Sequence, residues 1–107
     1  MLKIGGTGIR LTRGDRVRFT LRLIGEEVPD GTETVFTVKK SAWQHEEPLI
    51  EVEVPVLDNA VHIMLSPEQT NLTAGDYVWD LRMRVDEDVF TPMEYARFHV
   101  MEAIGYE

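Results

Sequence analysis

The chain has 107 residues, of which 43% are hydrophobic and 28% are charged, and this length and composition are typical of one folded domain. The 11 Lys and Arg residues and the 19 Asp and Glu residues give a net charge of −8, which disfavours nucleic acid and anionic membrane surfaces as partners. Because cysteine is absent, disulfides, thiolate metal sites and cysteine nucleophiles are excluded.

The N-terminal segment is rich in glycine, with the sequence Gly-Gly-Thr-Gly at positions 5–8. No Gly-Lys-Ser/Thr motif follows, so the segment does not match a phosphate-binding loop. We expect residues 1–8 to form a flexible arm and residues 9–107 to form a single domain. The candidate contacts of the arm with a neighbouring subunit are Gly5, Gly6 and Ile9. No apolar stretch is long enough for a signal peptide or a membrane span, so we expect no membrane insertion.

The first strand is predicted over residues 16–23, where apolar and polar residues alternate. Its polar positions include Arg16, Arg18 and Arg22, a basic stripe that faces either acidic neighbours in the fold or a second copy of the chain. The preceding tripeptide at positions 13–15, Arg-Gly-Asp, occurs in integrin ligands, which display it at the tip of a mobile loop. Here we interpret it as the turn that leads into the strand.

Further alternation predicts a second strand over residues 33–40, after a Pro-Asp-Gly turn at positions 29–31. One side of this strand carries Thr34, Phe36 and Val38. A polar loop that carries one tryptophan then precedes the next strand.

Residues 50–65 predict a hairpin of two strands joined by a two-residue turn at Asp58 and Asn59. Pro55 cannot donate a hydrogen bond to a neighbouring strand, so we expect its strand to lie at an edge or to end there. Residues 66–71, Ser-Pro-Glu-Gln-Thr-Asn, then predict a short helical turn, because serine caps a helix and proline fits its first position.

The C-terminal third of the chain predicts the longest strand, over residues 77–86, and two more extended segments at 89–91 and 97–104. About seven to eight short strands with turn signals between them are typical of a sandwich. We therefore predict an all-β, immunoglobulin-like antiparallel β-sandwich with one short helical turn.

The start of the longest strand resembles the tyrosine corner of immunoglobulin-like sandwiches, in which a tyrosine hydroxyl bonds to backbone a few residues upstream. The residues of this structural motif are Leu72, Gly75, Tyr77 and Trp79. A large ring fills the space between the sheets while its hydroxyl is satisfied locally, so the tyrosine is buried at small polar cost. We interpret the motif as architectural and not as a ligand site.

Residues that carry catalytic or metal chemistry are scattered in this sequence. His45, His62 and His99 have no paired metal-ligand spacing. The two serines, Ser41 and Ser66, do not lie in a nucleophile elbow. Acidic residues alternate with apolar ones on strand faces, where ion pairs between strands account for them. We therefore expect no enzyme activity, no metal and no cofactor.

Several segments occur in the same order as in small immunoglobulin-like structural domains of phages and prophages of Gram-positive bacteria. The resemblance is to the N-terminal domain of baseplate upper proteins, and it covers roughly residues 9–102. The matching segments are Arg-Gly-Asp at 13–15, Val-Arg-Phe-Thr-Leu-Arg-Leu at 17–23, Thr-Val-Phe-Thr-Val-Lys-Lys at 34–40, Leu-Ser-Pro-Glu-Gln-Thr at 65–70 and Ala-Gly-Asp-Tyr-Val-Trp-Asp-Leu at 74–81. This resemblance implies a non-catalytic virion component of a tail or baseplate, which forms a homo-oligomer and contacts other tail or baseplate proteins.

Two functions remain open from the sequence. In the first, the sandwich is a phage structural protein that binds identical copies and neighbouring proteins through the arm, the arginine stripe and Trp43, since an aromatic residue in a polar loop is a typical interface anchor. In the second, it is a carbohydrate-binding or adhesion module in which Trp43 stacks on a sugar beside His45, Glu46 and Glu47. A sandwich fold alone does not discriminate between them.

Overall fold

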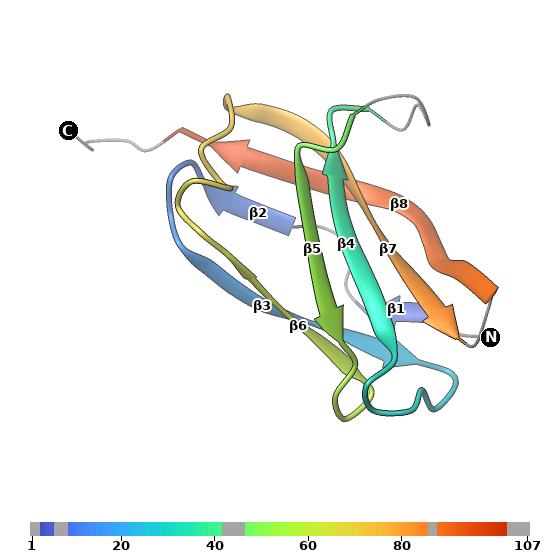
Figure 1. The fold of residues 1–107 in the computed structure, drawn as a ribbon. Helices are drawn as coiled ribbons and strands as arrows, with labels where there is room; N and C mark the ends of the chain where they lie inside the picture. The colour runs from blue at the N-terminus through green and yellow to red at the C-terminus, as the bar shows by residue number, and fades with distance from the viewer. Residues whose placement is uncertain (1–2, 6–8, 42–46, 86–87, 103–107) are drawn as a thin grey trace.

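In the computed structural model, which describes residues 3–5, 9–41, 47–85 and 88–102, the chain forms eight strands and no helix within these ranges (Figure 1). The strands are β1 (Lys3–Gly5), β2 (Ile9–Thr12), β3 (Val17–Ile24), β4 (Glu33–Lys39), β5 (Ile50–Pro55), β6 (Ala60–Leu65), β7 (Gly75–Val85) and β8 (Asp88–Met101).

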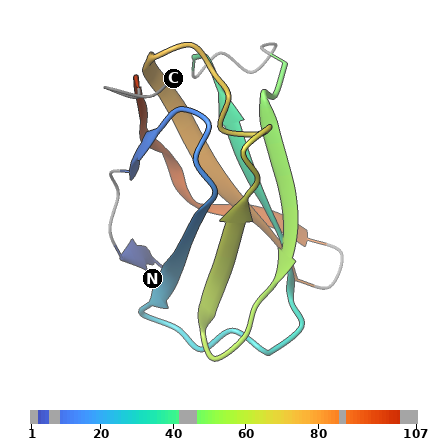
Figure 2. The same cartoon turned by 90° about the vertical axis from the view of Figure 1, so that its left-hand side faces the viewer.

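The eight strands form two sheets that pack face to face (Figures 1 and 2). The smaller sheet has the order β1-β3-β6, and the larger has the order β2-β8-β7-β4-β5. All the ladders are antiparallel except that between β2 and β8, which is parallel. The all-β, immunoglobulin-like sandwich predicted from the sequence is thereby confirmed, with one parallel pair added to it.

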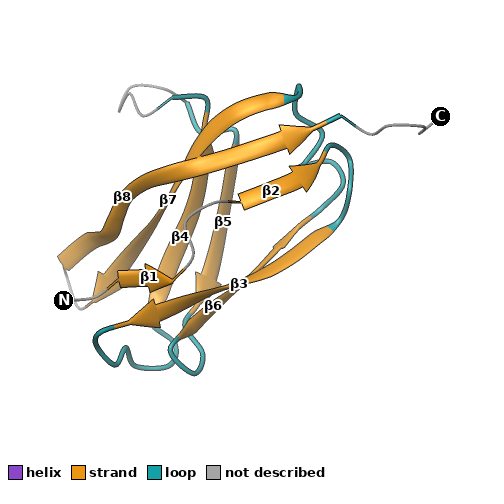
Figure 3. Cartoon of the chain, turned by 180° about the vertical axis from the view of Figure 1, so that it is seen from behind, coloured by secondary structure: helices purple, strands orange, loops and turns teal. Residues whose placement is uncertain are grey.

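The predicted N-terminal arm is not free over its described part. Lys3–Gly5 forms β1 and pairs with β3, while Ile9–Thr12 forms β2 and pairs with β8 in the other sheet (Figure 3). Backbone hydrogen bonds to a formed strand account for this order, because they do not depend on side chains and a glycine-rich segment can make them. The first segment of the chain therefore ties the two sheets together.

The core lies between the sheets and follows the alternation of the sequence. Phe36 of β4 is fully buried at its centre, 5.7 Å between ring centroids from Phe19 of β3, in the other sheet. It also lies 5.4 Å from Trp79 and 6.4 Å from Phe98, both within its own sheet. Aromatic pairs at these spacings contribute beyond their buried area. The same side of β4 buries Thr34 and Val38, which the alternation of the sequence groups with Phe36.

The predicted hairpin over residues 50–65 is wrong in its pairing, although its turn is present. Asp58 and Asn59 have φ of 53° and 56°, and Leu57 and Ala60 exchange backbone hydrogen bonds of 2.9 and 3.0 Å around them. However, β5 pairs with β4 and β6 pairs with β3, so the two strands separate after the turn into different sheets. In separate sheets, each strand buries its apolar side in the core between the sheets. A two-stranded hairpin by itself would not bury these sides.

The connection from β6 to β7 crosses between the sheets through a single turn and not through a helix. The Thr70 N–H donates to the Ser66 carbonyl at 3.1 Å, and the side chains of Ser66 and Gln69 each bond to the other's backbone N–H. These are the contacts of a capping box. The Thr70 hydroxyl then donates to the Asp15 carbonyl at 2.7 Å, which anchors the turn to the segment before β3.

The two C-terminal segments predicted separately are joined in one strand, β8, which pairs with β7 over nearly its whole length. The register shifts between Trp79 and Leu81 and again between Leu81 and Met83. Bulges of this kind let a strand continue past a local mismatch.

Candidate functional site

The outer side of the three-stranded sheet carries the arginine stripe. Arg18 and Arg22 are exposed on β3 and Arg16 is exposed directly before it, so these three side chains are called the arginine face. Within the described residues, none of them forms an ion pair. Of the two interpretations of the stripe, the fold favours contact with a second copy, because these arginines have no acidic partner among the described residues.

The neighbours of the arginine face on β6 are uncharged or apolar. Arg18 lies opposite Met64, and Arg22 lies opposite Ala60. Between them, Thr20 lies opposite His62, and the Thr20 hydroxyl and the His62 Nδ1 are 3.1 Å apart. Met64 is 52% exposed. This surface therefore combines fixed positive charge with accessible apolar area.

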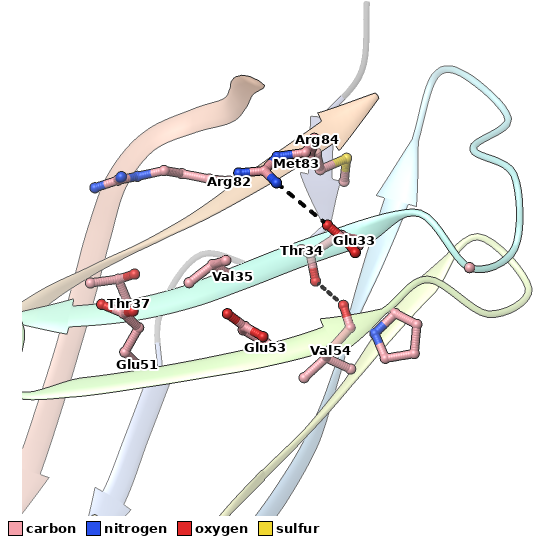
Figure 4. Close-up of a pocket in the computed structure, with 12 residues that line it drawn as sticks. Glu33, Thr34, Val35, Thr37, Glu51, Glu53, Val54, Arg82, Met83 and Arg84 are labelled. Atoms are coloured by element: carbon pink, nitrogen blue, oxygen red, sulfur yellow. Dashed lines mark hydrogen bonds and ion pairs between the residues drawn. The ribbon is translucent and has the colours of Figure 1, made fainter. Parts of the chain in front are cut away.

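The outer side of the five-stranded sheet contains an open groove of about 650 Å³ (Figure 4). Glu51 and Glu53 of β5 line one side, Arg82 and Arg84 of β7 line the other, and Val35 of β4 lies between them. The described lining residues include no aromatic side chain on which a sugar ring could stack. The groove is therefore a charged strip across three strands.

Part of the charge in this strip is paired within the chain. Arg84 Nη1 lies 3.8 Å from Glu33 Oε2, as the dashed line in Figure 4 marks. Both side chains are largely exposed, so this ion pair contributes less than about 1 kcal/mol. Such pairs between neighbouring strands are ordinary features of a solvated sheet face.

Asp80 is the unusual acid of this face. It lies opposite Thr37, which is buried, and its Oδ1 is buried without a hydrogen-bond partner. Burial raises the pKa of Asp80, and the positive charges of Arg82 and Lys39 lower it to a smaller extent. A partly desolvated carboxylate with an unsatisfied oxygen costs stability unless something else binds it.

At the far end of the same face, Asp76 of β7 and His99 of β8 form a pair across the two strands. The carboxylate Oδ1 and the imidazole Nδ1 are 2.7 Å apart. The hydrogen bond with His99 is the main cause of the lowered pKa of Asp76. Burial opposes it, and the charges of His99 and Arg97 lower the pKa further by smaller amounts. No serine, threonine or cysteine takes part in the pair, so it does not form a catalytic triad with them in the described structure.

The predicted tyrosine corner has a clear geometry. The Tyr77 hydroxyl donates to the Thr73 carbonyl at 2.5 Å, which is the backbone contact that defines this motif. Leu72 packs against the core, Gly75 opens β7, and Trp79 is 1% exposed. The indole Nε1 of Trp79 has no hydrogen-bond partner. Tyr77 and Trp79 are buried, so these two side chains support the fold.

The Arg-Gly-Asp tripeptide lies in the tight connection from β2 to β3. Arg13 lies 3.5 Å from Glu102 and donates through Nε to the Asn71 Oδ1 at 3.0 Å. Gly14 has φ of 82°, a conformation that favours glycine, and its N–H donates to the Thr70 carbonyl at 3.3 Å. An arginine engaged in two contacts and a backbone tied to its neighbour do not present a mobile loop tip.

Other predicted contact residues are only partly placed. Gly5 ends β1, and Ile9 begins β2 with its side chain packed against the core. Gly6 and Trp43 lie outside the described residues, as does His45, so the structure does not place the tryptophan proposed for sugar binding.

The side of the sandwich where β5 and β6 end their two sheets was not expected from the sequence. Three exposed hydrophobic residues lie on or beside these strands. Leu49 precedes β5, Leu57 lies in the turn and Met64 lies on β6, and they are 46%, 51% and 52% exposed. A signal was available, since β6 reads Ala-Val-His-Ile-Met-Leu and contains none of the Lys, Glu or Pro residues that guard edge strands. Its position at an edge was not predictable, because the expected hairpin paired it with β5.

Metal and membrane features are absent from the described ranges. No group of three or more His, Asp or Glu side chains gathers there in a way that could hold a metal ion. No helix in the same ranges has the length and hydrophobicity to span a bilayer. No protein-family model matches the sequence, and the curated proteins contain no match to it.

Proposed function

We propose that this protein is a non-catalytic structural component of a phage or prophage tail or baseplate, which acts by binding identical copies and neighbouring tail proteins. The observation that carries the proposal is the arginine face, because Arg16, Arg18 and Arg22 are exposed and have no described ion-pair partner. The order of sequence segments shared with phage sandwich domains supports the same assignment.

The charge distribution makes the arginine face a binding surface for acidic protein. The chain carries a net charge of −8, so three unpaired guanidinium groups on one sheet stand out against an acidic molecule. Guanidinium groups bind carboxylates in a planar, bidentate arrangement and lose little hydration when they are buried at an interface. An acidic patch on a copy or on another tail protein is the matching partner.

A structural role also agrees with the chemistry of the groove on the other sheet. Glu51 and Glu53 lie on the exposed surface of an edge strand, and the described lining residues include no serine, cysteine or histidine. General acid and base groups act efficiently when they are held in a cleft that excludes water. An open strip of solvated charges is better suited to contacts with another protein.

The decisive experiment is fractionation of induced particles. Particles from a strain that carries this gene are purified on a density gradient, and the chain is followed with an antibody raised against it. We expect the chain to sediment with particles, and immunogold to label the tail or baseplate. A chain that stays entirely in the soluble fraction of the lysate would refute the proposal.

The arginine face is tested in the same assay with charge-reversal variants. Arg18→Glu with Arg22→Glu is expected to reduce incorporation into particles. The matched control is Arg10→Glu with Arg97→Glu, which makes the same charge change on the five-stranded sheet. Equal incorporation of both variants would exclude the arginine face as the binding surface.

A further inference from the structure

The two sheets each end in a strand with a free edge on the same side of the sandwich. β5 is the last strand of the larger sheet and β6 is the last strand of the smaller one. The short turn between them keeps the two edges together, and the strands run in roughly opposite directions from it (Figures 1 and 2). We call this surface the β5–β6 flank and define it by Leu49, Glu51, Glu53, Leu57, His62 and Met64.

The backbone groups at these edges follow from the antiparallel ladders. The Leu23 N–H donates to the Asn59 carbonyl, so alternate residues of β6 point toward β3, and His62 and Met64 point their N–H and C=O groups to the free edge. The Val56 N–H donates to the Thr32 carbonyl, so on β5 the groups of Glu51 and Glu53 point outward in the same way. Each edge thus offers two consecutive alternate residues for pairing.

The side chains on the two edges are complementary in charge. β5 presents Glu51 and Glu53 on its outer face. β6 presents His62 and Met64, with Arg18 of the arginine face directly beside Met64. Pairing β5 with β5 of another copy sets carboxylates against each other, and like charges placed opposite across strands are destabilising. Pairing β6 with β5 sets carboxylates beside an unpaired arginine.

Exposed apolar area gives the flank a second reason to be covered. Leu49 begins the approach to β5, Leu57 lies in the turn, and Met64 lies on β6, and each exposes roughly half of its side-chain surface. Single exposed hydrophobic residues are ordinary, so these three add accessible apolar area near the two free edges but do not define the contact by themselves.

We propose that the flank binds a second copy of this chain, with β6 of each copy paired antiparallel to β5 of the other. The inference rests on the proposed function and names one of its partners. A twofold axis parallel to the flank exchanges the two sheets, so the β6 edge of one copy meets the β5 edge of the other, and the reverse contact forms at the same time. Each three-stranded sheet then continues into the five-stranded sheet of the second copy. The β5 and β6 edges of both copies are closed in this way.

The register of this pairing is set by Pro55. Placing His62 opposite Glu53 of the second copy also places Met64 opposite Glu51, and both pairs can exchange two backbone hydrogen bonds. A shift of two residues places His62 opposite Pro55, which has no N–H to donate, and one hydrogen bond is lost. In the first register, Glu51 lies opposite Met64, whose other neighbour is Arg18, and Glu53 lies opposite His62.

The first test is the mass in solution, measured by light scattering after size exclusion over a hundred-fold range of protein concentration. We expect the wild-type chain to form a dimer. We expect the double variant Glu51→Lys with Glu53→Lys to raise the dissociation constant of this dimer by about tenfold or more. Adding Arg18→Glu and Arg22→Glu to that variant restores complementary charge and is expected to restore the dimer. A wild-type chain that stays a monomer throughout would overturn the inference.

A matched control separates the flank from general charge effects. Glu27→Lys with Glu68→Lys gives the same net charge as the first variant and changes exposed residues outside β5 and β6. Lower net charge by itself favours association of an acidic protein, so this control is expected to dimerise at least as well as wild type. A dimer that both double variants weaken equally would also overturn the inference.

The second test fixes the register by crosslinking, which is clean because the chain has no native cysteine. His62→Cys with Glu53→Cys is expected to form a disulfide-linked dimer, since residues opposite each other at a hydrogen-bonded position lie about 5.5 Å apart between Cα atoms. His62→Cys with Glu33→Cys is the control, because Glu33 lies one strand further from the edge, and it is expected to stay monomeric on a non-reducing gel. A wild-type dimer in which the first pair does not crosslink would contradict this pairing.

Failure of this inference differs visibly from failure of the proposed function. A chain that is monomeric in solution but sediments with particles retains the structural role and loses the flank dimer. A flank dimer that never sediments with particles retains the pairing and loses the virion role.

Discussion

The outer faces of the two sheets differ in whether their charged side chains form ion pairs. On the five-stranded sheet, Glu33 pairs with Arg84 and Asp76 pairs with His99, each across neighbouring strands. On the three-stranded sheet, Arg18 and Arg22 have no described ion-pair partner. The larger face therefore balances part of its charge within the fold, whereas the smaller face leaves its charge available to another molecule.

This difference indicates which charged side chains of the two outer faces are left for contacts with another molecule. Surface ion pairs contribute little to stability, so the pairs on the larger face are not what holds the fold. The unpaired arginines form no ion pair within the described structure, so their contribution to the fold is confined to lowering the net negative charge. Under the proposed function, stability and binding are carried by different residues, and mutations should separate them.

The largest expected effect removes the core that both faces share. Phe36→Ala deletes the ring that contacts the other sheet through Phe19, and we expect a loss of about 3–5 kcal/mol in the free energy of unfolding. Urea denaturation followed by tryptophan fluorescence measures it. A loss below about 1 kcal/mol would mean that the two sheets do not depend on this contact.

An intermediate effect is expected at the connection that crosses between the faces. Tyr77→Phe removes the hydroxyl that donates to the Thr73 carbonyl, and we expect a loss of about 1 kcal/mol. The midpoint of urea denaturation should fall with an unchanged slope. An unchanged midpoint would count against the role of the tyrosine corner in fixing this crossover.

On the larger face, Asp80→Asn is expected to increase stability at neutral pH by up to about 1 kcal/mol, because it removes a charge from a partly buried oxygen without a partner. The pKa of Asp80 is raised in the folded state, so the folded protein binds the proton more tightly than the unfolded chain does. The cost of the wild-type carboxylate is therefore complete above the folded pKa and disappears as the pH falls toward the unfolded value of 3.8.

Urea denaturation of wild type and the Asp80→Asn variant at several pH values tests this sign. The stability advantage of the variant should shrink as the pH falls and vanish near pH 3.8. An advantage that grows on acidification would contradict the assignment of the raised pKa to Asp80.

The smallest expected effect on stability separates the two faces directly. Arg18→Ala with Arg22→Ala should change the free energy of unfolding by no more than about 0.5 kcal/mol, because exposed residues without partners contribute little. The same variant should nevertheless reduce self-association in light scattering. A loss of several kcal/mol would show that these arginines serve the fold and not a partner.

Much of the fold was predictable because strand alternation is a local signal. The buried side of β7 follows from period two alone, whereas on β4 the alternation groups Thr34, Phe36 and Val38 on one side without showing which side is buried. The turn at Asp58 and Asn59 was predictable from residue types that tolerate positive φ. The single helical turn after β6 was also predictable from the serine and proline at its start, and its capping contacts are present.

The candidate surfaces were only half predictable for a related reason. The arginine stripe is visible in the sequence, but whether it meets an acid depends on strands far away in the chain. The flank was hidden, because its two strands are consecutive and look like a paired hairpin. A turn constrains only the few residues around it. The sheet that each strand joins depends on where its apolar side packs in the core.

By itself, the sequence determined the strands from β3 to β7, the buried sides of β3 and β7 and the tyrosine corner, since these depend on neighbours within a few residues. Only the tertiary structure decided that β1 and β2 join different sheets, that β2 runs parallel to β8, and that β5 and β6 part to leave two free edges. Backbone hydrogen bonds join strands without regard to side chains, so partner and register are set by packing of the whole domain. The surface proposed for a second copy is a product of that packing.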